Sequence, residues 1–165
     1  TLVKWTSMFD PNIFNWRIFN PDEGVPEHVC QWLLDSQSLT AKLRDKYIDF
    51  KVNVLSQQKN KPFDCELKLL GSVSHKAIFV REVELIGSNA PVVFARSVIP
   101  HTDDTNIILK IGSKPLGEIL FNDPNIKRGQ LEVGEFNNVW ARRSTFSIGI
   151  TNLLVTEIFL ETLYA

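Results

Sequence analysis

The sequence has little cysteine and no excess of positive charge. Its two cysteines, Cys30 and Cys65, form no CxxC pair, and no cysteine–histidine cluster has zinc spacing. Two thiols are compatible with a reducing cytosol. The net charge of −1 argues against a protein that binds nucleic-acid phosphates, because such proteins are usually basic. A small anionic ligand held by one or two arginines is still compatible with this charge.

Long hydrophobic runs are also missing. The first residues, TLVKWTSMFDPNIFNW, contain no continuous apolar core of the kind found in signal peptides. The longest stretch without charge, from Ser144 to Thr156, is too short to cross a bilayer. The sequence therefore predicts a cytoplasmic protein, and we expect a compact monomer.

Several catalytic motifs are absent as well. There is no GxSxG motif of a serine hydrolase, and GSKPLG (residues 112–117) lacks the GK[ST] ending of a P-loop. The histidines are scattered, at His28, His75 and His101. None has a second histidine at ligand spacing, so the sequence gives no support for a metal site.

What is present is the pattern of one α+β domain. A chain of 165 residues with 44% hydrophobic residues can build a single core. Helical periodicity is expected within 26–46, with Ser38 as an N-cap, and a loop followed by a short helix within 107–121. Alternation predicts about six strands, at 47–57, 76–87, 90–100, 126–136, 142–150 and 152–160. Most are joined as hairpins, GSNA being a clear turn signal, so we expect an antiparallel sheet.

Three charged residues are predicted to lie on strand faces that are otherwise apolar. In LLVTEIFL (residues 153–160), a spacing of two places Glu157 among apolar side chains. The same alternation places Arg81 on the apolar face of IFVREVEL and Arg96 on the apolar face of VVFARSV. An isolated carboxylate in such surroundings costs several kcal/mol unless it is paired.

Two interpretations of these charges are open. They could form a structural ion-pair network or lie on exposed faces of a two-sided sheet. Alternatively, they could line an anion pocket, in which arginine grips a carboxylate and a desolvated glutamate, with its pKa raised by burial, donates a proton. The opposite face of IFVREVEL, which carries Glu82 and Glu84, is expected to face solvent.

Six segments, taken in order, strongly resemble the chorismate lyase (chorismate–pyruvate lyase) family. They are WLLDSQSLT, VRE, ARSVIP, PLGEILF, WARRSTF and LLVTEIFL. The resemblance extends from about Trp32 to Leu160 and leaves residues 1–25 as a weakly constrained N-terminal segment. It implies that residues 1–165 form a single chorismate lyase-like domain.

The resemblance implies short helices that act as flaps over an internal ligand site in the sheet. It also implies conversion of chorismate to 4-hydroxybenzoate and pyruvate, the initial step of ubiquinone biosynthesis in bacteria, without a metal or organic cofactor. The ligand-contacting arginine and glutamate of the family map to Arg81 and Glu157, which we expect to bind substrate and to be catalytic. Backbone contacts map to Leu39 and Leu116; at Leu39 some relatives have methionine.

The sequence gives weaker support for a role of the other arginines in the ligand site. Arg96 has no ligand contact assigned by the resemblance and is expected to support the pocket or Glu157. Arg142 and Arg143 must face opposite sides of a strand, so at most one can reach the pocket. We favour surface or structural roles for both.

Two alternative functions are weighed against the lyase. One is a non-catalytic small-molecule sensor domain of the same architecture, and the other is an enzyme acting on another cyclic enolpyruvyl acid. The presence of both Arg81 and Glu157 favours the lyase. Two routes are open for Glu157: it could donate a proton, or it could only polarise the substrate during an intramolecular hydrogen shift.

Overall fold

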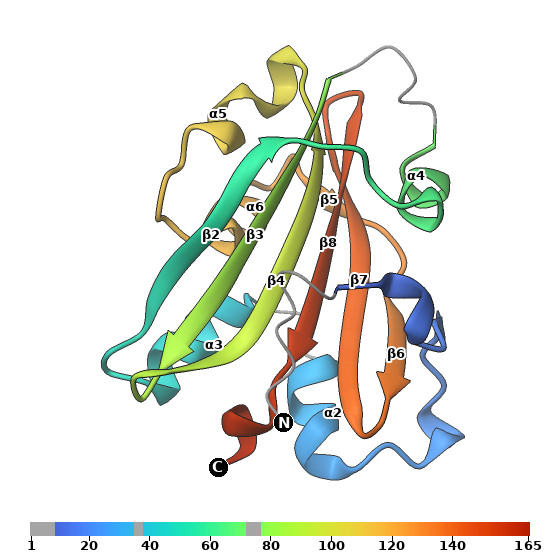
Figure 1. The fold of residues 1–165 in the computed structure, drawn as a ribbon, viewed down its shortest axis with the longest axis vertical. Helices are drawn as coiled ribbons and strands as arrows, with labels where there is room; N and C mark the ends of the chain where they lie inside the picture. Colours follow the sequence, from blue (N-terminus) through green and yellow to red (C-terminus); the bar gives the residue numbers. More distant parts are fainter. Residues whose placement is uncertain (1–8, 35–37, 72–76) are drawn as a thin grey trace.

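The computed structural model describes residues 9–34, 38–71 and 77–165. One sheet runs through it in the order β1-β6-β7-β8-β4-β3-β2, with β5 also paired to β7, and every pair is antiparallel (Figure 1). The strands are β1 (Arg17–Ile18), β2 (Lys51–Lys59), β3 (Ile78–Gly87), β4 (Ala90–Pro100), β5 (Lys127–Arg128), β6 (Glu132–Phe136), β7 (Val139–Ile148) and β8 (Thr151–Phe159).

The helices are short. The α-helices are α2 (Glu27–Leu33), α3 (Leu39–Lys46), α4 (Asp64–Leu70), α5 (Asn106–Leu109) and α6 (Leu116–Asn122). Four 3₁₀ helices accompany them, η1 (Pro11–Ile13), η2 (Pro21–Glu23), η3 (Asp103–Thr105) and η4 (Glu161–Tyr164). No helix in the described ranges has the length and apolar character needed to cross a membrane.

The predicted α+β class is confirmed, with eight strands in place of about six. One additional strand is β1, in the weakly constrained N-terminal segment. The other arises because the segment 126–136 divides into β5 and β6. At the division, Gly129 donates its N–H to the carbonyl of Thr145, and a Cβ at Gly129 would lie 2.3 Å from Thr145 Oγ1. A Cβ at this position would therefore force the Thr145 side chain or the strand to shift.

The hairpin between β3 and β4 forms at the predicted GSNA turn. Ser88 and Asn89 have φ values of 49° and 60°, which fit the left-handed conformations of a type I′ turn. Asp49 accepts hydrogen bonds from both N–H groups, at 2.9 and 2.8 Å, and these bonds hold the pKa of its carboxyl below the ordinary value. This turn, together with a one-residue register shift between Leu85 and Ile86, places Arg81 opposite Ser97.

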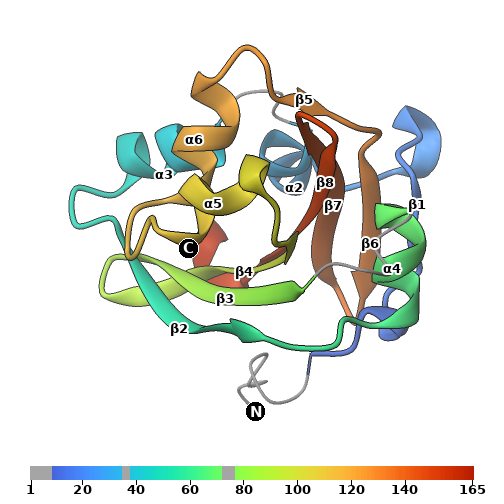
Figure 2. The same cartoon turned by 90° about the horizontal axis from the view of Figure 1, so that it is seen from above.

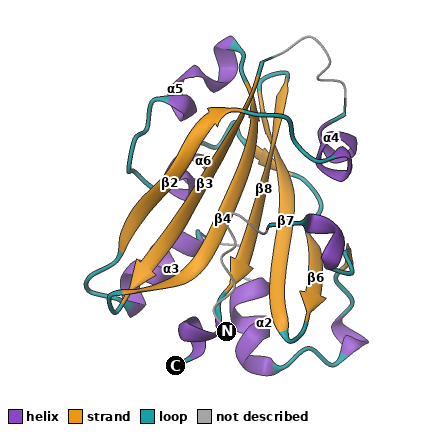
Figure 3. Ribbon diagram, viewed as in Figure 1, coloured by secondary structure: helices purple, strands orange, loops and turns teal. Residues whose placement is uncertain are grey.

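The sheet is strongly curved, and elements cover both of its faces. Seen from above in Figure 2, β2, β3 and β4 form one arm and β8, β7 and β6 the other. Helices α2, α3, α5 and α6 lie inside the curve, whereas α4 and η1 lie outside it (Figures 2 and 3). The inner face therefore offers the concave surface on which a pocket can form.

Both faces have an apolar core. Inside the curve, side chains of α2 and α3, including Leu33 and Leu43, pack on residues such as Val93 and Phe159. Outside it, a second cluster contains Phe9, Phe14, Phe94, Ala141 and Ile158. The face of β3 that carries Glu82 was predicted to face solvent. This prediction was wrong at Glu82, which is half-buried and contacts Arg96.

Candidate functional site

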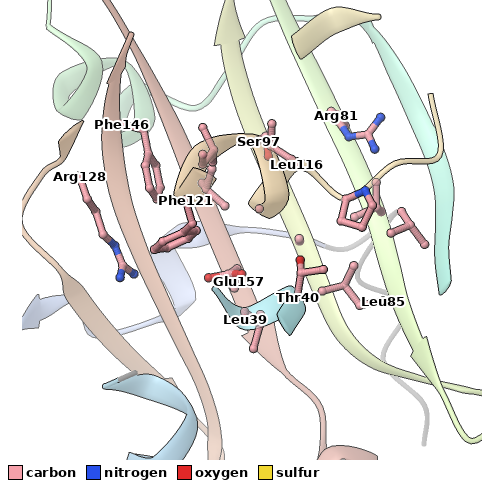
Figure 4. Close-up of a pocket in the computed structure, with 17 residues that line it drawn as sticks. Leu39, Thr40, Arg81, Leu85, Ser97, Leu116, Phe121, Arg128, Phe146 and Glu157 are labelled. Atoms are coloured by element: carbon pink, nitrogen blue, oxygen red, sulfur yellow. The ribbon is translucent and has the colours of Figure 1, made fainter. Parts of the chain in front are cut away.

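A cavity lies between the inner face of the sheet and the first turns of α3 and α6 (Figure 4). It contains about 590 Å³ of empty space, part of which opens to solvent. Its apolar lining includes Val83, Leu85, Ala95, Leu120, Phe121, Phe146 and Val155, and its charged lining is Arg81, Arg128 and Glu157. An apolar pocket with a few fixed charges suits a small, anionic organic ligand.

All four residues that the sequence nominated line this one cavity. Arg81 comes from β3 and Glu157 from β8, with β4 between them. Leu39 and Leu116 are the first residues of α3 and α6. The structure thus brings the nominated residues together, and their roles toward a ligand stay predictions.

Within the described ranges, Arg81 is buried without an anionic partner. Its side chain is 3% exposed, and Nη1 donates to Gln57 Oε1 at 3.1 Å while Nη2 donates to the carbonyl of Lys114 at 3.3 Å. No carboxylate in the described ranges forms an ion pair with it. Burial lowers the pKa of Arg81, because desolvation disfavours its charge. A buried cation held only by neutral acceptors is a ready binding site for an anion.

Glu157 pairs with Arg142, and not with Arg96, which was expected to support the pocket or Glu157. Arg142 lies directly opposite it on β7, and its Nε donates to Glu157 Oε1 at 2.8 Å. The Glu157 side chain is 17% exposed, so one part of it still faces the cavity. A carboxylate that is paired with a guanidinium accepts hydrogen bonds and donates none. This geometry favours an acceptor role for Glu157 over proton donation.

Arg142 is 1% exposed, so a surface role is excluded. Its Nη1 donates to the carbonyls of Trp32 and Leu33, at 3.0 and 3.1 Å, in the last turn of α2. The negative end of the helix dipole favours a cation at this place. Arg142 therefore fixes Glu157 relative to α2. The sequence had indicated a surface or structural role and missed its pairing with Glu157.

Arg143 faces the other side of the sheet, as alternation required. Its Nε donates to Glu132 Oε1 at 2.8 Å, and its guanidinium lies 4.2 Å from the centroid of the Trp16 ring. Of the two neighbouring arginines, only Arg142 is in contact with a side chain of the cavity. Arg143 belongs to the outer core.

Arg96 also lies on the outer face, so the expectation that it supports the pocket or Glu157 was wrong. Its Nε and Nη2 donate to both carboxylate oxygens of Glu66 in α4, each at 2.9 Å. Glu82 lies 3.5 Å from Nη1, and burial raises the pKa of this second carboxyl. Arg96 is thus part of a structural ion-pair network, the interpretation that the sequence pattern left open.

The first turns of α3 and α6 bring backbone N–H groups to the cavity. Ser38 caps α3 as predicted, its Oγ accepting from the N–H of Ala41 at 3.4 Å. The N–H groups of a first helical turn have no partner within their helix, which applies to Leu39 and Leu116. These groups can therefore contribute donors next to Arg81 and Glu157.

The two closing helices touch one another. A Cβ at Gly117 would lie 2.9 Å from Thr40 Oγ1, so the glycine of PLG allows the helices to approach. Arg44 in α3 forms an ion pair with Glu118 in α6. This pairing of α3 with α6 agrees with the expectation that short helices act as flaps over the site. Residues 35–37, which precede α3, lie outside the described ranges.

Sequence reasoning missed Arg128 and the two aromatic rings beside it. Strand β5 contains only two residues, so it carries no readable alternation. Its register places Arg128 opposite Phe146, and the guanidinium lies 5.7 Å from the ring centroids of both Phe121 and Phe146. Only the folded arrangement reveals that these residues share a cavity wall.

The two histidines in the described ranges, His28 and His101, give no second candidate site. His101 Nε2 is 2.7 Å from Asn106 Oδ1, and His28 stacks edge-on against Tyr164. His75 lies outside the described ranges. Across the ranges that the structure covers, no three His, Cys, Asp or Glu side chains are grouped to hold a metal ion.

Comparison with known proteins agrees with this site. The family model described as chorismate lyase matches residues 12–165. A probable chorismate pyruvate-lyase of Aromatoleum aromaticum is 35% identical, over 93% of this chain and 95% of the relative. One of Psychromonas ingrahamii is 37% identical, over 81% and 83%.

Among solved structures, a possible transcriptional regulator, YydK from Bacillus subtilis, has a similar fold. The TM-score is 0.51 at 12% identity, over 70% of this chain and 59% of that one. This likeness concerns the fold alone, whereas the sequence comparisons span nearly the whole chain. The chain belongs to the chorismate lyase family.

Proposed function

We propose that the protein converts chorismate to 4-hydroxybenzoate and pyruvate. One observation carries the proposal: a buried arginine with no carboxylate partner in the described ranges, Arg81, lines the same cavity as Glu157. Membership of the chorismate lyase family and the names of the relatives support it. The activity would be the initial step of ubiquinone biosynthesis, carried out in the cytoplasm by a monomer.

Chorismate is a dianion with one carboxylate on the ring and one on its enolpyruvyl ether. Arg81 binds the ring carboxylate, because a planar guanidinium can donate two parallel hydrogen bonds to it. The N–H groups of Leu39 and Leu116 add donors from the closing helices. Together they fix one end of the ring and exclude water from it.

Glu157 acts at the end of the ring that bears oxygen. As a carboxylate paired with Arg142, it accepts a hydrogen bond from the ring hydroxyl and orients the neighbouring ether. The reaction breaks the bond between the ring and the ether oxygen. The hydrogen on the hydroxyl-bearing carbon is lost and ends on the terminal carbon of the released enolpyruvate, which becomes the methyl group of pyruvate.

Atoms and charge balance in this reaction without another reagent, and the ring gains aromatic stability. The demand on the protein is therefore to hold the reactive conformer in a dry, preorganised site. A cavity with apolar walls and three fixed charges meets this demand.

The proposal is tested by incubating the purified protein with chorismate. The concentration of 4-hydroxybenzoate, measured by its absorbance, and that of pyruvate, measured by a coupled assay, should rise equally. A sensor domain would bind the ring without releasing pyruvate, and an enzyme for another enolpyruvyl acid would leave chorismate intact. Either result would overturn the proposed function.

Glu157→Gln should lower kcat for chorismate by about 10²-fold, the lower end of the range for a positioned acid–base group. Glutamine keeps the shape and can still accept from Arg142, so the fold should persist. The free energy of unfolding should fall by only about 1 kcal/mol, because a neutral acceptor replaces a charged one. Steady-state kinetics and urea unfolding measure the two effects.

The matched control for this variant is Glu161→Gln, which removes an exposed carboxylate outside the cavity. It should leave both kcat and stability unchanged. Turnover by Glu157→Gln at the wild-type rate would remove Glu157 from the mechanism.

Gly117→Ala should weaken binding of 4-hydroxybenzoate by about tenfold. The added Cβ would lie 2.9 Å from Thr40 Oγ1, so the buried Thr40 side chain or α6 must shift, and a shift of α6 away from α3 carries the N–H of Leu116 with it. Such small displacements in a site can cost up to about 10²-fold. Isothermal titration calorimetry measures the affinity.

The double variant Gly117→Ala/Thr40→Ala removes the clashing oxygen and is the control. It should recover most of the lost affinity. If the single variant binds as tightly as the wild type, close contact between α3 and α6 is not needed to complete the site.

A further inference from the structure

Gln57 holds the guanidinium of Arg81 although it does not line the cavity. The two residues lie directly opposite one another in the pairing of β2 with β3. Arg81 Nη1 donates to Gln57 Oε1 at 3.1 Å, and Gln57 Nε2 donates to the carbonyl of Leu109 at 2.8 Å. Because a carbonyl cannot donate, these two contacts fix which end of the amide faces Arg81.

An irregularity in β2 turns Gln57 toward Arg81. Val54 lies opposite Val83 in the cavity wall, so strict alternation from Val54 would turn Gln57 to the outer face of the sheet. The register shifts by one residue between Val54 and Ser56, and Gln57 therefore shares the inner face with Arg81. Bulges of this kind often re-aim a side chain beside a functional site.

Gln57 and Arg81 together hold the segment that leads into α6. Leu109 is the last residue of α5, which lies inside the curve of the sheet, and Lys114 precedes α6 by two residues (Figure 2). Gln57 donates to the carbonyl of Leu109, while Arg81 Nη2 donates to the carbonyl of Lys114 at 3.3 Å. The Gln57 amide therefore affects both the direction of the guanidinium and the position of the first N–H groups of α6.

A neutral amide meets both demands without neutralising the charge of Arg81. It accepts from the guanidinium on one side and donates to a carbonyl on the other. A glutamate at this position would form an ion pair with Arg81 and would turn a second acceptor toward the carbonyl of Leu109. A leucine would leave the guanidinium without its side-chain acceptor.

We infer that Gln57 is a positioning residue, which orients the guanidinium of Arg81 for the carboxylate of the ligand and leaves its charge available. The inference rests on the proposed function and adds a residue to the same site. Because Gln57 is neutral, a ligand carboxylate does not have to displace an internal one from it. The protein thereby selects a ring that carries a carboxylate over the same ring with a neutral group.

The test compares 4-hydroxybenzoate with 4-hydroxybenzamide, a neutral analogue of similar shape. Gln57→Glu should weaken binding of 4-hydroxybenzoate about 10- to 100-fold, the range for one charged hydrogen-bonded contact, because the new carboxylate pairs with Arg81 in place of the ligand. Binding of the amide, also measured by calorimetry, should change by less than about threefold. KM for chorismate should rise with kcat kept within about threefold, because the ring carboxylate is held equally before and during the reaction.

Gln58→Glu is the matched control. Gln58 is exposed and lies opposite Val80, so the same charge is added one residue away on the opposite face of the strand. It should leave the affinities for both ligands unchanged, which excludes a long-range effect of added charge.

Gln57→Leu removes both hydrogen bonds without adding charge. It should weaken binding of 4-hydroxybenzoate about fivefold and that of the amide by less, because Arg81 keeps its charge but loses its orientation. This variant decides the same question if Gln57→Glu does not fold.

Wild-type affinity for 4-hydroxybenzoate in the Gln57 variants would overturn the inference. So would an equal loss for 4-hydroxybenzoate and its amide, which would mean that Gln57 only supports the segment before α6. In both cases the wild type would still form 4-hydroxybenzoate from chorismate, so the proposed function would stand. A wild-type protein that forms none would overturn the proposed function, while the preference for the carboxylate over the amide would still test Gln57.

Discussion

Arg81→Met is expected to lower kcat/KM for chorismate by about 10³-fold and to weaken 4-hydroxybenzoate binding to a similar extent. Within the described ranges, Arg81 has only neutral partners, Gln57 and the carbonyl of Lys114, so the ligand would supply its anion. Truncating one member of a buried charge pair costs about 2–5 kcal/mol, or roughly 30- to 4,000-fold. Kinetics and calorimetry report the two losses.

The same variant should be no less stable than the wild type. Methionine keeps the unbranched apolar part of the arginine side chain, and it removes a buried charge that, within the described ranges, has no carboxylate partner before the ligand binds. The free energy of unfolding in urea should therefore stay the same or rise. If 4-hydroxybenzoate binds Arg81→Met with wild-type affinity, Arg81 does not hold the ligand.

Arg96→Met should have the opposite profile and lower the free energy of unfolding by about 3–5 kcal/mol. The substitution leaves the carboxylate of Glu66, 1% exposed, without the guanidinium that holds both of its oxygens. Domains have total stabilities of about 5–15 kcal/mol, so the variant should be marginal. Urea denaturation measures this loss, and any folded fraction should still bind 4-hydroxybenzoate.

A double variant tests the cause. Arg96→Met/Glu66→Leu replaces the buried pair by apolar groups, and such replacements are often neutral or stabilising. It should recover most of the stability lost by the single change. Wild-type stability in Arg96→Met would mean that solvent reaches Glu66 and that the ion pair contributes little.

The alternation of residues in long strands predicted the most informative parts of the site. In β3 and β8, a period of two was enough to turn Arg81 and Glu157 toward apolar neighbours, and the structure places both in one cavity. The turn between β3 and β4 was also readable, because GSNA favours left-handed conformations. These features depend on local chemistry alone.

Other parts depended on what covers each face of the sheet, which alternation does not reveal. Alternation placed Arg142 and Arg143 on opposite faces, as the structure has them. It did not separate Arg81 from Arg96, because both faces of the sheet are covered by apolar residues. Helix α4, which covers the outer face and carries Glu66, was not predicted at all. In the structure, the first turn of α4 is held by a hydrogen bond from the N–H of Phe63 to Glu66 Oε1.

The strict alternation of β3 and β8 restricts how this protein can change in length. Arg81 faces the ligand cavity and Glu82 faces Arg96, one residue apart along the same strand. A single-residue insertion or deletion within β3 would exchange the two faces, moving an acid into the chamber and a guanidinium into the outer layer. Evolutionary gain or loss of residues should therefore be confined to the connections between strands.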